Sequence, residues 1–89
     1  MLRITKIFEN DLTMILRLDG KIVNATTAEL EGACCQYRNG GGKALSLDFS
    51  GVTFIDNDGL GTLKKIKNKG IAMVNGSPFV ETLLGGLEK

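Results

Sequence analysis

The chain has 89 residues, of which 43% are hydrophobic and 24% charged, with a net charge of +1. This length fits one domain, and folding at this size buries roughly 60–65% of the surface that the unfolded chain exposes. The composition excludes a disordered chain, and the near-neutral charge excludes a strong general attraction for nucleic acid or anionic lipid. We therefore expect a single domain over residues 1–89 with no nucleic-acid partner.

The sequence also predicts a reducing compartment. No apolar run approaches the roughly 18 residues that span a bilayer, and residues 1–6 lack the core of a signal peptide. Cys34 and Cys35 are adjacent, which suits neither an unstrained disulfide nor the usual spacing of metal ligands. We expect free thiols, with Cys34 on the buried side of a helix, and a cytoplasmic protein without direct membrane insertion.

The first elements in chain order form a predicted β-hairpin. Residues 2–8 and 12–18 alternate apolar and polar side chains on either side of the turn signal Asn10-Asp11. Asp19-Gly20 then predicts the end of the second strand.

A helix should follow. Thr26, with Glu29 three residues later, predicts a capping box at its start. Its apolar positions repeat at helical spacing: Leu30, Ala33, Cys34 and Tyr37. Residues 39–42, Asn-Gly-Gly-Gly, should end it.

The second half of the chain predicts an alternation of strands and helices. The expected elements are a strand at 44–49, a short run at 52–55, a helix from Leu60 to Gly70, a strand at 71–74, and a helix from Ser77-Pro78 to Leu87. The resulting order, β-β-α-β-α-β-α, predicts an α/β fold with a mixed four- to five-stranded sheet and helices packed against it.

No catalytic constellation is visible. Asp48, Asp56 and Asp58 could suggest a cation site, but their spacing matches no EF-hand loop. The chain has no histidine to activate a serine or cysteine nucleophile, and its glycine runs match no phosphate-binding fingerprint. We expect no enzyme activity, no metal and no cofactor.

The turn at residues 56–59 supports two interpretations. Asp58 could cap the following helix while Gly59 permits a tight turn, or Asp56, Asn57 and Asp58 could be displayed to a partner. The basic run at 64–69 is interpreted as a solvated helix end rather than a phosphate-binding patch.

A family resemblance favours the second interpretation of the turn. The segments 18–22 (LDGKI), 26–30 (TTAEL) and 47–61 (LDFSGVTFIDNDGLG) resemble the STAS domain of bacterial anti-sigma-factor antagonists and sulfate-transporter tails. The resemblance implies a non-enzymatic regulatory domain that binds a protein. The residues it implies for partner binding are Asp56, Asn57, Asp58, Gly59, Leu60 and Gly61.

This chain departs from the family pattern in several places, the first of them in the loop. In the family, a serine in the loop is phosphorylated by a partner kinase, and Asp58 stands at that position here. The resemblance therefore implies a fixed negative charge at Asp58 in place of a phosphorylation switch. Val23 also replaces an acidic residue that antagonists often carry, and the second helix looks about one turn short.

The resemblance leaves the pathway open. The partner could be an anti-sigma kinase-like protein or the ATPase of an ABC-type lipid or anion transporter, with the chain as an accessory subunit. A small-ligand or nucleotide-binding STAS domain is a further alternative, and a homodimer is left open.

Overall fold

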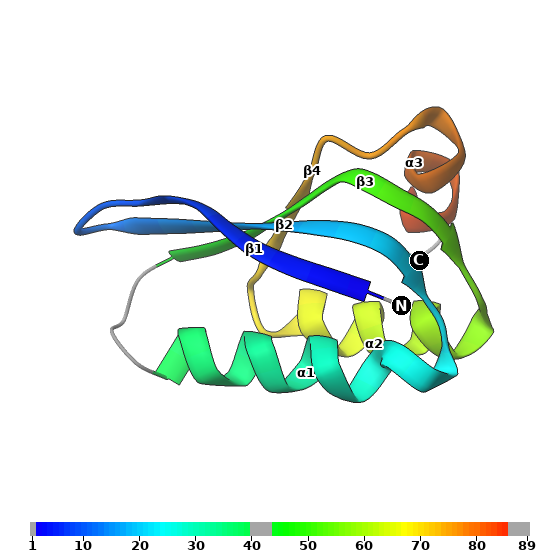
Figure 1. Cartoon of the computed structure of the whole chain (residues 1–89), viewed down its shortest axis with the longest axis horizontal. Coiled ribbons are helices and arrows are strands. Elements are labelled where there is room, and N and C mark those ends of the chain that lie inside the picture. The colour runs from blue at the N-terminus through cyan, green and yellow to red at the C-terminus, as the bar shows by residue number, and fades with distance from the viewer. Residues whose placement is uncertain (1, 40–43, 86–89) are drawn as a thin grey trace.

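The computed structural model describes residues 2–39 and 44–85. Seven elements follow one another along the chain (Figure 1): β1 (Leu2–Glu9), β2 (Thr13–Ile22), α1 (Asn24–Asn39), β3 (Ala44–Ile55), α2 (Asn57–Asn68), β4 (Ala72–Val74) and α3 (Pro78–Gly85). The predicted order β-β-α-β-α-β-α is confirmed. The predicted turn at 40–42 and the helical position of Leu87 lie outside the described residues.

A four-stranded mixed sheet organises the molecule. Its strand order is β1-β2-β3-β4, with β1 antiparallel to β2 and the two remaining pairs parallel. The helices α1 and α2 lie side by side against one face of the sheet, and α3 lies apart from them against β3 (Figure 1). This arrangement confirms the predicted α/β class and the mixed sheet.

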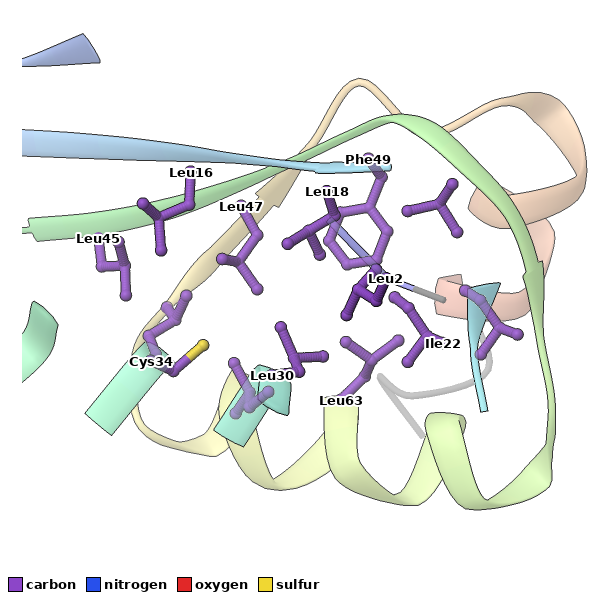
Figure 2. Packing of buried hydrophobic residues seen from close by; sticks show 14 of the residues in the cluster. Leu2, Leu16, Leu18, Ile22, Leu30, Cys34, Leu45, Leu47, Phe49 and Leu63 are labelled. Carbon is purple, nitrogen blue, oxygen red and sulfur yellow. The ribbon is translucent and has the colours of Figure 1, made fainter. Parts of the chain in front are cut away.

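The core lies between the sheet and the α1–α2 pair. Alternate residues of the two central strands point into it, because successive side chains of a strand face opposite sides. In Figure 2, Leu30 and Cys34 of α1 and Leu63 of α2 point toward Leu47 and Phe49 of β3. Leu30, Leu47, Phe49 and Leu63 are fully buried, and burial of such a side chain stabilises the fold by about 1.5–3 kcal/mol.

The third strand is longer than the sequence predicts. The runs at 44–49 and 52–55 form a single strand, β3, which pairs with β2 through two register shifts. These irregularities keep the pairing intact across Ser50-Gly51, where the sequence pattern breaks. Consequently β3 ends at Ile55, immediately before the loop of interest.

The predicted capping box at the start of α1 is wrong. The helix begins at Asn24, so Thr26 is inside its first turn rather than at its cap. Thr26 is buried, and its Oγ1 accepts from the Val23 amide at 3.0 Å and donates to the Lys21 carbonyl at 2.9 Å. The hydroxyl therefore fastens the β2–α1 turn, and the cap comes from elsewhere in the chain.

Neither cysteine forms a disulfide bond, and the two lie in different environments. Cys34 is buried and Cys35 exposed, as the helical pattern predicts for Cys34. Burial raises the pKa of the Cys34 thiol to about 11. Because the thiolate is the reactive species, Cys34 should be unreactive in the folded protein.

We therefore expect iodoacetamide to modify Cys35 much faster than Cys34 at pH 8. Peptide mass spectrometry after timed quenching measures both rates in one sample. Denaturant should bring the two rates close together. Equal rates in the native protein would contradict the burial of Cys34.

Asp48 is a buried carboxylate on β3. Burial alone would raise its pKa, but hydrogen bonds from Ser50 and Asn75 and the charge of Arg17 together lower the pKa below its ordinary value. The Ser50 amide donates to Asp48 Oδ1 at 2.8 Å. The ionised form is thus the one that the fold stabilises.

This environment predicts an acid-sensitive contribution to stability. A carboxyl whose pKa is lower in the folded state stabilises the fold above its unfolded pKa of about 3.9 and loses that effect as pH falls through the lower folded value. Asp48→Asn should therefore lower the free energy of unfolding at pH 6. The difference from the wild type should shrink in urea titrations below pH 4. A difference that is constant from pH 6 to pH 3 would contradict this role of the ionised carboxylate.

Candidate functional site

Asp56 is the N-cap of α2 and joins two parts of the chain. It has extended backbone angles (φ −92°, ψ −176°), and its Oδ1 accepts from the Gly59 amide at 2.7 Å. Its Oδ2 accepts from the Asn24 amide, at the start of α1, at 3.1 Å. One carboxylate therefore satisfies backbone donors at the starts of two helices, where the helix dipoles also favour a negative charge.

The interpretation of Asp58 as the helix cap is therefore wrong. Both aspartates precede a helical pattern, and the local sequence fits either as a cap. Asp56 takes the role because it follows the last residue of β3 in an extended conformation, while Asp58 already lies in the first turn of α2. Asp58 is exposed and adds a negative charge near the positive end of the helix.

Gly59 brings the start of α2 against the β2–α1 turn. It is buried, and a Cβ at this position would collide with the carbonyl oxygen of Ile22. The same carbonyl accepts from the Asp56 amide at 3.1 Å. The two turns are thus in backbone contact, and only glycine leaves the space that this contact needs.

The six residues predicted to bind a partner divide into two groups. Asp56 and Gly59 hold the loop in place, and Leu60 is half-buried against the core. Asn57, Asp58 and Gly61 are exposed. We call these three exposed residues the loop surface.

Gly61 differs from Gly59 although both belong to α2. A Cβ at Gly61 would have no neighbouring atom within 4 Å. Glycine inside a helix costs about 1 kcal/mol relative to alanine, and no packing in the described structure requires it here. The helix backbone is therefore open to close approach at this point.

The basic run occupies the end of α2. Lys65 and Lys67 lie in its last turn and Lys69 is the C-cap. Positive charges at this end of the helix interact favourably with the negative end of the helix dipole. This agrees with the interpretation of the basic run as a helix end.

The three aspartates Asp48, Asp56 and Asp58 do not form a cation site. Among residues 2–39 and 44–85, no three side chains of His, Cys, Asp or Glu lie close enough to hold a metal ion. Within the same ranges, no helix is long and apolar enough to cross a membrane.

The structure also reveals residues that sequence patterns missed. Asn24 and Ile22 hold the loop through backbone atoms, and the bond from Asn24 to Asp56 spans 32 residues. Val23 is half-buried, and its carbonyl accepts from the amides of Thr26 and Thr27 at 2.8 Å and 3.1 Å. No side-chain pattern signals these roles, because the groups involved are main-chain atoms.

The fold and this loop define a class of small α/β domain. In this class an acidic turn, here between β3 and α2, lies with the exposed helix start at one edge of the sheet. The chain belongs to the STAS domain family, whose model matches residues 5–84. Among curated proteins, no match was found.

Solved structures share the fold. An unphosphorylated anti-sigma factor antagonist, SpoIIAA, is 15% identical, with a TM-score of 0.64 over 91% of this chain and 80% of that one. A STAS domain of an antisigma-factor antagonist from Rhodobacter sphaeroides is 17% identical, with a TM-score of 0.65 over 83% of this chain and 86% of that one. The native form of Mglu is 18% identical, with a TM-score of 0.55 over 83% of this chain and 22% of that one.

Proposed function

We propose that this STAS domain is a non-enzymatic regulatory module that binds a protein partner through the loop surface. The proposal rests on one observation: some residues of the loop hold it in place, while others are exposed. Asp56 and Gly59 fix it to the β2–α1 turn, and Asn57, Asp58 and Gly61 are thereby held exposed on a rigid edge. Rigid loops that display polar side chains are common binding sites.

We expect the partner to recognise the negative charge of Asp58. The family resemblance implies a phosphorylated serine at this position, and a phosphoserine would add about −1.5 to −2 charges at the helix start. Asp58 supplies one negative charge that no kinase or phosphatase can change. The domain would then bind in a single state, in the manner of a family member whose switch is fixed.

Gly61 adds a steric feature to this surface. It lies one helical turn after Asn57 and Asp58, and so on the same side of α2. A partner could contact the helix backbone there, which would explain a glycine that destabilises the helix without serving the packing of the described residues.

A binding experiment with a charge-matched control tests the proposal. Isothermal titration calorimetry measures binding of the purified domain to candidate partners from the same organism. The candidates are anti-sigma kinase-like proteins and transporter ATPases. Asp58→Asn should weaken binding of the true partner at least tenfold and leave the unfolding midpoint nearly unchanged. Asp11→Asn removes the same charge from an exposed position in the β1–β2 turn and should change neither. Equal affinity for both variants would contradict a role of Asp58 in recognition.

A second measurement tests the fixed-charge version alone. Incubation with the partner kinase and ATP should leave the wild-type domain unphosphorylated. Stoichiometric phosphate on Thr53 or Thr62 would contradict it. Thr62 is buried, so phosphate there would also require the helix to open.

A further inference from the structure

The connection between β4 and α3 contains an Asn-Gly pair with unusual geometry. Asn75 has a φ of 59°, and within the described residues it alone among non-glycine residues has a positive φ. Asparagine tolerates this left-handed conformation better than most side chains. The left-handed backbone conformation therefore explains why asparagine occupies this position in the turn.

Gly76 is favoured at the next position by packing. A Cβ there would meet Cγ1 of Val80 at 3.0 Å. Val80 is fully buried in α3, so it has little room to move. The fold thus places a residue without a side chain directly after Asn75.

The side chain of Asn75 is tied to the buried Asp48. Val74, one residue earlier, pairs with Asp48 in the sheet, and Asn75 makes a side-chain hydrogen bond with the Asp48 carboxylate. Because an ionised carboxylate only accepts, the Asn75 amide must be the donor. This bond holds the end of β4, a strand of three residues, against the middle of β3.

We infer that Asn75 is a site of spontaneous deamidation, and that its conversion releases β4 and α3 from the sheet. The amide nitrogen of Gly76 loses its proton and attacks Cγ of Asn75, and the side-chain nitrogen leaves as ammonia. Water then adds to one of the two carbonyls of the resulting succinimide, which gives aspartate or isoaspartate. The bare Cα of Gly76 offers no steric hindrance to the attack.

The product does not fit the native site. A carboxylate at position 75 cannot donate to Asp48, and it brings a second negative charge next to a buried one. Isoaspartate additionally lengthens the backbone by one methylene group in a turn that needs a left-handed residue. The sheet pairing of β4 covers only residues 46–48 of β3, so the connection that follows β4 helps to hold the strand in place. Most residues of the core lie on β2, β3, α1 and α2, and we expect this part of the fold to remain folded.

The hydrogen bond to Asp48 should slow the reaction in the native protein. An amide that donates to Asp48 is held in one position, and cyclisation requires the turn to open. The rate of conversion therefore reports the opening of the β4–α3 connection.

The test follows the intact chain over time. The protein carries Asn39→Gln, which removes the sequence's other Asn-Gly pair. It is incubated at 37 °C and pH 8, and peptide mass spectrometry separates asparagine, aspartate and isoaspartate. We expect conversion at Asn75 faster than at Asn10, Asn24, Asn57 or Asn68. Hydrogen exchange of the converted fraction should rise in β4 and α3 and stay unchanged in β2 and α1.

Two variants make the outcome decisive. Asp48→Ala should accelerate conversion several-fold relative to the Asn39→Gln parent, because the amide loses its acceptor. Asn75→Asp reproduces one product directly, and should lower the unfolding midpoint and raise exchange in β4 and α3 even if Asp48→Ala does not fold. The inference is overturned if Asn75 converts no faster than the other asparagines. It is equally overturned if Asn75→Asp leaves exchange in β4 and α3 unchanged.

Discussion

Gly59→Ala should lower the free energy of unfolding by about 3 kcal/mol. The new Cβ would collide with the Ile22 carbonyl oxygen, which is backbone and cannot rotate away. The start of α2 would have to move from the β2–α1 turn, and the Asp56 bonds to Asn24 and Gly59 would lengthen. Urea unfolding monitored by circular dichroism measures the loss.

Gly61→Ala is the matched control in the same helix. It makes the same chemical change two residues later, where a Cβ has open space. Alanine should therefore stabilise the protein by up to about 1 kcal/mol through its higher helix propensity. Opposite signs for the two variants would establish that Gly59 serves a backbone contact, whereas losses of similar size would contradict it. Under the proposed function, Gly61→Ala should also weaken partner binding despite the gain in stability.

Asp56→Ala should destabilise the protein by about 2 kcal/mol. The substitution removes a helix cap and leaves backbone donors at the starts of two helices without their charged acceptor. Asp56→Asn should recover part of this loss, because the amide oxygen can still accept one of the two bonds. Thermal unfolding and urea titration report both effects.

Asp58→Ala provides the comparison for Asp56. Asp58 is exposed and is not the cap, so its removal should change stability by less than about 0.5 kcal/mol. A loss at Asp58 as large as that at Asp56 would restore Asp58 as the structural residue. The predicted pair of outcomes separates the residue that builds the loop from the residue that, under the proposed function, a partner recognises.

The identity and order of the elements could be predicted from the sequence because they depend on local patterns. Alternating apolar residues in 2–8 and 12–18 predict the hairpin, and the helical spacing of Leu30, Cys34 and Tyr37 predicts the buried side of α1. The segment 47–61 was sufficient to indicate the family. The structure confirms these predictions through β1, β2 and the burial of Leu30 and Cys34.

Helix starts were predicted less well. Thr26 and Asp58 both satisfy the local rules for a cap, and neither is one. The acceptor for the Asn24 amide comes from Asp56, 32 residues away, after β3 has returned the chain to the same edge of the sheet. A rule that inspects neighbouring residues cannot find a cap that the fold supplies from another loop.

The sequence by itself determined the class of fold and the family, because periodicity and motif are properties of the chain alone, and it led to the prediction that Asp56–Gly61 binds a partner. Only the tertiary structure decided which of those six residues build the loop and which face outward. Asp56 and Gly59 turn inward because the β2–α1 turn offers them an amide to bind and a carbonyl to pack against. The exposed residues of the segment form the surface through which we propose that the domain binds: Asn57, Asp58 and Gly61.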